Sequence, residues 1–263
     1  MARARPPALS KERNERIYQV LKERRTMRIA EFQEYLGVSD MTVRRSLNEM
    51  ASEGLIRRVH GGAMAIEEKD DHSFQTRCNQ NREMKIALAK KAVEFIPENG
   101  SVYLDAGSTC LAVAKALATD GRKCIVITDS ILVLQELQGS ATVEAMILGG
   151  TLAGDKVTVD GALTVETAEK ISVGLSIFSA NAFDDEQMEN QFLTGALTKK
   201  IFIERAARSM FIADSSKYGK QSCFRFSGWE DVDILLTDSG LPDAAAAAIR
   251  GKDVEVHLVP LPD

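Results

Sequence analysis

Seven short apolar runs, separated by helix-like stretches, constrain the fold of this chain more than any other feature. The runs are 101–105, 124–128, 143–148, 175–179, 210–214, 233–238 and 254–259. Each is apolar nearly throughout, which is typical of strands that are covered on both faces. Helices between such strands favour right-handed βαβ units and a largely parallel sheet. The sequence therefore predicts an α/β domain over residues 83–263.

Polar turns follow four of these runs, where the parallel strands would end. The turn from Gly107 to Thr109 opens a helix, and backbone N–H groups at a helix N-terminus attract phosphate. Lys217 adds a point charge to another turn. Each turn alone is explained equally well as a helix cap, but four together favour a ligand site at the carboxyl edge of the sheet. The candidate ligand residues in these turns are Asp105, Gly107, Ser108, Thr109, Thr128, Asp129, Ser130, Gly149, Gly150, Asp214 and Lys217.

The first 66 residues differ from the rest of the chain in charge. They hold 13 Lys and Arg against 8 Asp and Glu, a net charge of +5, while the remainder holds 20 against 30, a net charge of −10. A basic head on an acidic body indicates that only the head binds a polyanion.

Three short helices and a hairpin are expected in this head. The first helix is predicted over 10–24 with Ser10 as its cap, and the second over 29–36, ended by Gly37. A third helix, capped by Ser39, is predicted to reach residue 53. Two short apolar pieces around Gly61 and Gly62 then predict a hairpin. The short turn between the second and third helices has the spacing of a helix-turn-helix, and the hairpin would be its wing.

The third predicted helix has a buried stripe, Val43, Leu47 and Met50, with polar and basic residues on its other side. Arginine suits guanine or phosphate, and asparagine suits adenine. A solvated charged helix beside a surface hairpin is the alternative, but the combination of caps, stripe and wing favours DNA binding. The candidate DNA-binding residues are Ser39, Met41, Thr42, Arg44, Arg45, Asn48, Arg57, Arg58, His60 and Gly61.

The head resembles the N-terminal domain of DeoR-family bacterial transcription regulators. The resemblance is carried by Val38-Ser39, by the run from Thr42 to Leu47 and by the run from Arg58 to Ala63. The chain departs from the family pattern where Ser46 replaces the usual aspartate and Gln33 replaces a small residue.

The body resembles the effector domain of the same family, and through it the fold of sugar-phosphate isomerases. The motifs are REMK-IA, the turn from Asp105 to Thr109, ITDS, LGGT and DSSKYG. The resemblance implies that Asp105, Gly107, Ser108, Thr109, Thr128, Gly149, Gly150 and Lys217 would meet a phosphorylated sugar. Asn181 and Ala182 stand where the family has Asp-Gly, so Asn181 is a further candidate effector residue. The acidic run 184–186 that follows is expected to be a solvated loop.

These observations predict a flexible arm (1–9), a winged helix-turn-helix domain (10–66), a linker (67–82) and an α/β effector-binding and oligomerisation domain (83–263). The family resemblance implies a cytoplasmic regulator, most often a repressor, that binds operator DNA as a homodimer or homotetramer. A phosphorylated sugar would control its DNA binding.

Two other functions remain open on the sequence. One is a sugar-phosphate isomerase or transferase with a DNA-binding appendage, in which Asp105, Asp129, Asp214 or Lys217 would act as acid or base. The other is an architectural DNA binder, which leaves the polar turns unexplained. The four cysteines are scattered without a C-x-x-C pair, so no zinc site, disulfide framework or redox sensor is expected. We also expect no cofactor, and no membrane partner because no apolar run approaches about 20 residues.

Overall fold

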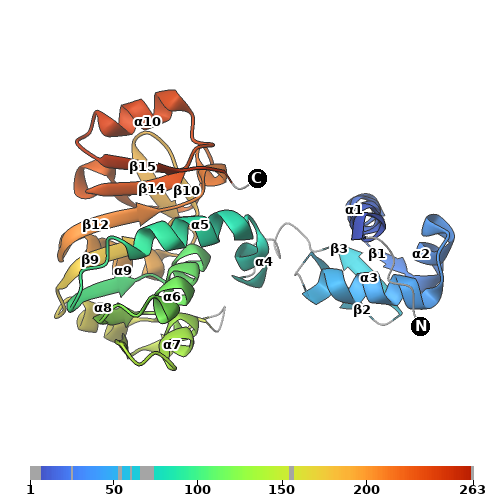
Figure 1. Ribbon diagram of the computed structural model, residues 1–263, viewed down its shortest axis with the longest axis horizontal. Helices are drawn as coiled ribbons and strands as arrows, with labels where there is room; N and C mark the ends of the chain where they lie inside the picture. Colours follow the sequence, from blue (N-terminus) through green and yellow to red (C-terminus); the bar gives the residue numbers. More distant parts are fainter. Residues whose placement is uncertain are drawn as a thin grey trace. The chain divides into compact units, whose positions relative to one another are not determined.

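The computed structural model describes residues 7–24, 26–52, 55–59, 61–65, 74–153 and 157–261 (Figure 1). The chain divides into two compact units, Met1–Gln80 and Asn81–Asp263. This division falls two residues before the predicted start of the α/β domain. No helix in the described ranges is both long and apolar enough to cross a bilayer.

The described part of the first unit contains four helices and a small antiparallel sheet. The helices are α1 (Pro7–Arg24), α2 (Ile29–Leu36) and α3 (Asp40–Ser52), and a short α4 (Phe74–Asn79) follows later in the chain. The strands β1 (Thr26–Arg28), β2 (Ile56–Val59) and β3 (Gly62–Ala65) form a sheet in the order β1-β3-β2. The predicted helices and hairpin are therefore present, and β1 was not foreseen.

Three predicted boundaries need correction. Helix α1 begins at Pro7, so residues 7–9 are not part of an arm and Ser10 is not its cap. Proline suits the first turn of a helix because its missing N–H would have no partner there. Residues 74–79 of the predicted linker form α4, and Arg82 already belongs to the next helix. Residues 1–6 of the predicted arm, residues 67–73 of the linker and the predicted end of α3 at 53 lie outside the described residues.

The core of the first unit joins all three predicted helices. Ile17 and Leu21 of α1, Phe32 of α2, and Val43 and Leu47 of α3 are fully buried together. The i, i+4 spacing in α1 and α3 places each pair on one helix face. This confirms the predicted buried stripe of α3, whose third member, Met50, is also in the core.

The second unit is built on a seven-stranded sheet in which every neighbouring pair is parallel. All seven predicted runs are strands of this sheet. In spatial order they are β15 (Glu255–Val259), β14 (Ile234–Asp238), β12 (Ala206–Ile212), β9 (Val173–Phe178), β4 (Gly100–Leu104), β5 (Cys124–Thr128) and β6 (Val143–Ile147).

The strand order reverses beside β4. The chain runs outward from β4 to β5 and β6 and then returns to form β9 on the other side of β4. The loops after β4 and β9 therefore leave the sheet in opposite directions. This is the position at which open α/β sheets bind ligands.

Helices cover both faces of this sheet (Figure 1). Helices α5 (Arg82–Val93), α6 (Ser108–Asp120) and α7 (Ile131–Leu137) pack side by side, and α8 (Ala162–Ala168) packs against α9 (Leu193–Glu204). Tyr103 of β4 stacks on Phe202 of α9, with ring centroids 4.0 Å apart. Its neighbours Val102 and Leu104 point to the opposite face, because side chains alternate along a strand. The last helix, α10 (Asp243–Arg250), contacts β15.

Short elements beyond the main sheet were not predicted. Strands β10 (Ala182–Phe183), β11 (Gln187–Asn190) and β13 (Phe224–Gly228) form a small antiparallel sheet, and β7 (Thr151–Leu152) pairs with β8 (Val159–Asp160). The turns η1 (Ser215–Lys217) and η2 (Trp229–Asp231) are 3₁₀ helices. The acidic run 184–186 is the hairpin turn between β10 and β11.

Candidate DNA-binding surface and effector site

The outward face of α3 carries the residues that the sequence assigned to DNA. Met41 is 81% exposed, and Arg44, Arg45 and Asn48 are exposed on the side away from the buried stripe. The helical period of 3.6 residues separates these two faces. The described part of the head therefore presents two arginines and an amide to solvent from one helix.

Each of these arginines has an acidic partner one helical turn away. Arg44 Nε donates to Asp40 Oδ1 (2.5 Å), and Arg45 Nε donates to Glu49 Oε1 (3.0 Å). Exposed i, i+4 pairs of this kind contribute only about 0.3–0.5 kcal/mol. DNA phosphates or base edges can therefore replace the carboxylates at little cost.

Ser39 and Thr42 are placed at the start of α3. Ser39 Oγ lies 2.9 Å from Thr42 Oγ1 and 3.4 Å from the Thr42 backbone nitrogen, which donates to it. Ser39 therefore caps the helix, as predicted. Both residues keep some exposure, so their hydroxyls remain close to the surface that α3 presents.

Ser46 is fully buried rather than on the outward face. Arg13 Nε of α1 donates to Ser46 Oγ (2.7 Å). The departure from the family pattern at this position thus affects a contact between α1 and α3, and it leaves the outward face unchanged.

The wing strands place the two further arginines differently. Arg57 is exposed, whereas Arg58 is half-buried, and its buried Nη1 atom has no hydrogen-bond partner in the described part of the chain. Gly61 has φ 77°, the left-handed conformation that favours glycine in a tight turn. Gly62 is the first residue of β3, and a Cβ atom there would lie 2.2 Å from the Met27 carbonyl oxygen. His60 lies outside the described residues.

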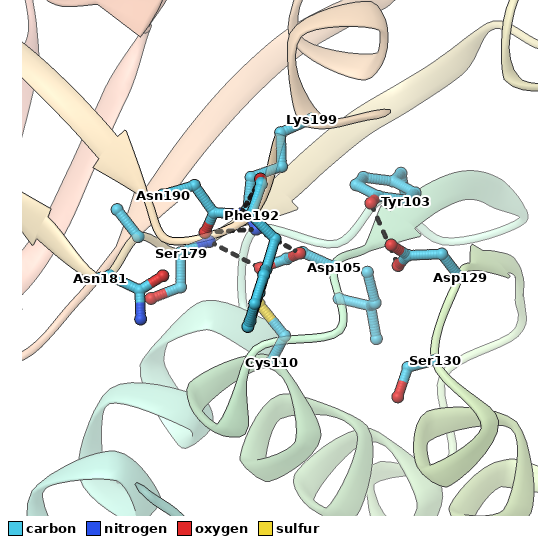
Figure 2. Close-up of polar contacts among 12 residues, drawn as sticks. Tyr103, Asp105, Cys110, Asp129, Ser130, Ser179, Asn181, Asn190, Phe192 and Lys199 are labelled. Carbon is cyan, nitrogen blue, oxygen red and sulfur yellow. Dashed lines mark hydrogen bonds and ion pairs between the residues drawn. The ribbon is translucent and has the colours of Figure 1, made fainter. Parts of the chain in front are cut away.

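In the second unit a buried ion pair lies at the end of β4 (Figure 2). Lys199 Nζ of α9 lies 2.8 Å from Asp105 Oδ1, and both side chains are under 10% exposed. The second oxygen, Asp105 Oδ2, accepts a hydrogen bond from the Ser179 backbone nitrogen (3.1 Å), which links the ends of β4 and β9. Cys110 Sγ donates to the same oxygen (3.9 Å), so Asp105 is held by three partners rather than open on all sides.

Asp129, at the end of β5, shares this buried region. Tyr103 Oη donates to Asp129 Oδ1 (3.2 Å). Burial and the negative charge of Asp105 raise the pKa of Asp129 from 3.8 to about 7, and the nearby Lys199 opposes the rise. Asp129 is therefore about half protonated at neutral pH.

The N-terminus of α6 forms the next part of the cluster. Gly107 is its N-cap residue, and the first helical residues, Ser108 and Thr109, are buried. A Cβ atom on Gly107 would lie 3.3 Å from Ser179 Cβ, so this turn packs closely on the end of β9. Thr109 Oγ1 is buried and has no hydrogen-bond partner among the described residues.

Lys217 approaches the same place from the end of β12. Its Nζ atom donates to Ser179 Oγ (3.1 Å) and to the Ala180 carbonyl oxygen (2.7 Å). Burial lowers the pKa of Lys217 from 10.5 to about 8, although Asp214 acts to raise it. Burial acts to raise the pKa of Asp214, but Lys217 and the hydrogen bonds from Ser216 and Asn81 leave it lowered.

Five predicted effector residues make hydrogen bonds or close contacts with other parts of the second unit. Thr128 Oγ1 donates to the Leu104 carbonyl oxygen, and Ser130 Oγ caps α7 by accepting from the Val133 nitrogen. The Gly149 carbonyl oxygen accepts a hydrogen bond from Thr164 Oγ1 (2.7 Å). A Cβ atom on Gly150 would lie 2.2 Å from Thr164 Oγ1. The fifth, Asn181, accepts at Oδ1 from the Gln191 nitrogen (3.0 Å).

The acidic run beside Asn181 makes contacts within its own surroundings. Asp184 Oδ1 accepts from the Glu186 and Gln187 nitrogens, which closes the hairpin turn. Asp185 Oδ1 accepts from Tyr218 Oη (2.8 Å), and Glu186 pairs with Lys252 (2.8 Å).

Several residues of the cluster were missed on the sequence. Lys199 shares one face of α9 with the buried Ala196 and Ile203, and a lysine on an apolar stripe was the available signal. Lys85 is buried one turn into α5, and its charge acts on both Asp214 and Lys217. Tyr103 and Ser179 lie in or after apolar strands, where no spacing identifies them. The described residues contain no group of histidine, cysteine and acidic side chains that could hold a metal ion.

The two units match two family models. Residues 13–69 match the DeoR-like helix-turn-helix domain, and residues 80–239 match the DeoR C-terminal sensor domain. An uncharacterized HTH-type transcriptional regulator, YulB of Bacillus subtilis (strain 168), is 31% identical over 95% of this chain and 97% of its own length. The glycerol-3-phosphate regulon repressor of Escherichia coli (strain K12) is 26% identical over 94% of this chain and 98% of its own.

Among solved structures, ribose 5 phosphate isomerase A from Neisseria gonorrhoeae is similar over 54% of this chain and 56% of its own, with a TM-score of 0.39 and 23% identity. The sensor model alone covers more than half of the chain, and both models match in the order expected of one regulator. The chain belongs to the DeoR family of DNA-binding transcriptional regulators.

Proposed function

We propose that this chain is a repressor whose binding to operator DNA is controlled by a phosphorylated sugar or polyol. The observation that carries the proposal is the convergence of three strand ends on Ser179. Asp105 accepts from its nitrogen, Gly107 packs on its Cβ atom, and Lys217 donates to its hydroxyl. The N-terminus of α6 and the charge of Lys217 thus lie on either side of one serine.

These groups suit a phosphate on one end of the ligand and hydroxyl groups on the other. Helix N-terminal amides and a lysine stabilise a phosphate. The pair of Asp105 and Lys199 offers an acceptor and a donor for sugar hydroxyl groups. The named relative is a repressor for a glycerol-3-phosphate regulon, which supports a small phosphorylated polyol or sugar as the ligand class.

The DNA-binding half of the proposal rests on the outward face of α3 and on the wing. We propose that Arg45 and Asn48 read base edges, and that Arg44 and Arg57 contact phosphates. One such head offers few base contacts, and doubling it through two-fold symmetry extends the operator. We therefore propose at least a homodimer, which acts in the cytoplasm where operator DNA lies.

We propose no catalytic activity. The two relatives described above are named as transcriptional regulators, and neither name supports an isomerase activity. Lys199 and the Ser179 nitrogen hold Asp105 in a fixed orientation, which suits a carboxylate that binds a ligand hydroxyl group. A turnover assay with pentose and hexose phosphates should show no conversion.

The proposal is tested by thermal unfolding of the full chain with a panel of phosphorylated and unphosphorylated sugars and polyols. A ligand at about 100 times its dissociation constant stabilises the folded state by about 2.7 kcal/mol, which raises Tm by a few degrees. Lys217→Ala should abolish most of that rise. Lys220→Ala, an exposed lysine three residues further on, should leave it unchanged.

A different pattern would contradict the proposal. If only unphosphorylated sugars raise Tm, and Lys217→Ala keeps the rise, the α6 N-terminus and Lys217 do not hold a phosphate.

A further inference from the structure

Asn81 is the first residue of the second unit, which is called the sensor unit from here on. Its side chain is hydrogen-bonded to the turn that carries Lys217. The chain divides between Gln80 and Asn81. Asn81 Nδ2 donates to Asp214 Oδ1 (2.8 Å) and to Ser216 Oγ (3.1 Å). Asp214 and Ser216 belong to the 3₁₀ turn η1 and its cap, and Lys217 is the last residue of that turn.

The backbone of Asn81 has an uncommon conformation. Its φ of 51° and ψ of 38° are left-handed, and Asn99 and Asp253 are the other non-glycine residues of the described ranges with positive φ. Asparagine tolerates this region better than most residues do. Helix α4 ends at Asn79 and α5 begins at Arg82, so Asn81 is the residue at which the chain enters the sensor unit.

The partners of Lys217 are ones that an anion can replace. Its Nζ atom donates to a serine hydroxyl and to the Ala180 carbonyl oxygen, whereas a phosphate offers a charged acceptor. The turn is short, and the backbone nitrogen of Lys217 donates to the Asp214 carbonyl oxygen (3.2 Å). A ligand that draws Lys217 away from these partners therefore acts on the turn that also carries Asp214 and Ser216, the two partners of the Asn81 amide.

We propose that Asn81 couples ligand binding at Lys217 to the DNA-binding unit. Without ligand, the amide ties the entry of the sensor unit to the η1 turn. With ligand, Lys217 leaves the Ala180 carbonyl, the turn shifts, and the tie at Asn81 weakens, which changes how the preceding chain is held. Asn81 is a positioning residue that does not touch the ligand. This inference rests on the proposed function.

The test measures the dissociation constant of the full-length protein for DNA, with and without ligand. The DNA is a duplex that the wild-type protein selects from a random library. The ligands are inorganic phosphate and the panel compound that raises the wild-type Tm most. We expect ligand to weaken wild-type DNA binding at least fivefold, within the usual range of allosteric coupling.

Asn81→Gly isolates the side chain, because glycine adopts the left-handed conformation freely. In this variant we expect the ligand dissociation constant to stay within twofold of wild type, while the effect of ligand on DNA binding falls below twofold. Asn81→Asp keeps the size and the backbone tolerance but turns a carboxylate toward Asp214, so it should lose the coupling as well. Asn99→Gly makes the same substitution at another exposed left-handed asparagine and should retain the full effect.

Three results would overturn the inference. The first is full coupling in Asn81→Gly and Asn81→Asp. The second is loss of ligand binding in both variants, which would make Asn81 part of the ligand site. The third is a wild type that responds to no compound, which would overturn the proposed function too, whereas the first two results leave that function standing.

Discussion

At the scale of single residues, the DNA-binding surface and the sensor use opposite electrostatic arrangements. The arginines of α3 are exposed and paired with carboxylates that they can exchange for DNA. In the sensor, Asp105, Asp129 and Lys199 are buried and Lys217 is half-buried, so each charge there depends on its neighbours. Screening by salt should therefore weaken DNA binding strongly and ligand binding less.

Arg45 is the residue whose removal should most clearly change sequence preference. Arg45→Ala should cost about 1–3 kcal/mol on the selected duplex and relax specificity, because this exposed guanidinium faces away from the core. Arg250→Ala, an exposed arginine of α10, is the control. Competition binding with mismatched duplexes measures both effects. Unchanged affinity and unchanged preference would remove this face of α3 from the groove.

The raised pKa of Asp129 predicts that the stability of the folded chain depends on pH. Its pKa is raised from 3.8 to about 7, so between these values the folded chain keeps a proton that the unfolded chain has lost. Wild-type stability should therefore fall as pH rises through this window, by at most about 4 kcal/mol from this group. Asp129→Asn should remove the dependence, so the Tm of the variant relative to wild type should increase from pH 4 to pH 7 and then level off. A difference that is the same at every pH would contradict the raised pKa.

The sequence alone could not show which residues of the sensor cluster contact one another. Asp105 and Lys217 stand in turns with recognisable composition, and the structure places both against Ser179. Lys199 pairs with Asp105 across 94 positions of sequence, and no local spacing encodes such a contact. Thr128 and Ser130 look like ligand residues in sequence, but the Thr128 hydroxyl group donates to the Leu104 carbonyl oxygen of β4, and the Ser130 hydroxyl group accepts from the Val133 nitrogen of its own turn.

At the scale of elements, the seven main strands were predictable because both of their faces are covered, so their apolar runs are continuous. Strands β10, β11 and β13 were not, since β10 has two residues, β11 alternates between partly exposed and buried positions, and β13 begins with two exposed residues. The run Gln187–Asn190 contains three polar residues, yet Met188 and Asn190 are buried. The acidic residues before it form the turn of the β10–β11 hairpin. Trp229 stabilises this turn by donating from Nε1 to the Asp184 carbonyl oxygen.

The wing depends on the close contact between β1 and β3. Gly62→Ala would place a Cβ atom 2.2 Å from the Met27 carbonyl oxygen, so one of these two strands must move. Overpacking of this kind costs about 1–3 kcal/mol. Amide hydrogen exchange of β1 and β3 should therefore be faster, and DNA affinity lower. Gly139→Ala is the control, since an added Cβ atom there meets nothing within 4 Å, and normal exchange in Gly62→Ala would contradict the account.

At the scale of the whole molecule, a basic head and an acidic body are joined within one chain, so the net positive charge that attracts DNA lies in the head. Two heads on one operator would require assembly through the rest of the chain. We expect static light scattering at micromolar protein to give at least twice the mass of 28.8 kDa. A monomer, both free and on DNA, would contradict the two-fold arrangement.

The central claim is that a phosphorylated ligand held at Lys217 controls DNA binding by α3 and the wing. The most direct test is fluorescence anisotropy of the selected duplex, titrated with the full-length protein with and without the panel compound that raises Tm most. We predict that the compound weakens DNA binding by wild type and by Lys220→Ala at least fivefold, and changes binding by Lys217→Ala less than twofold. Equal DNA affinity with and without ligand in the wild type, or an undiminished response in Lys217→Ala, would contradict the account.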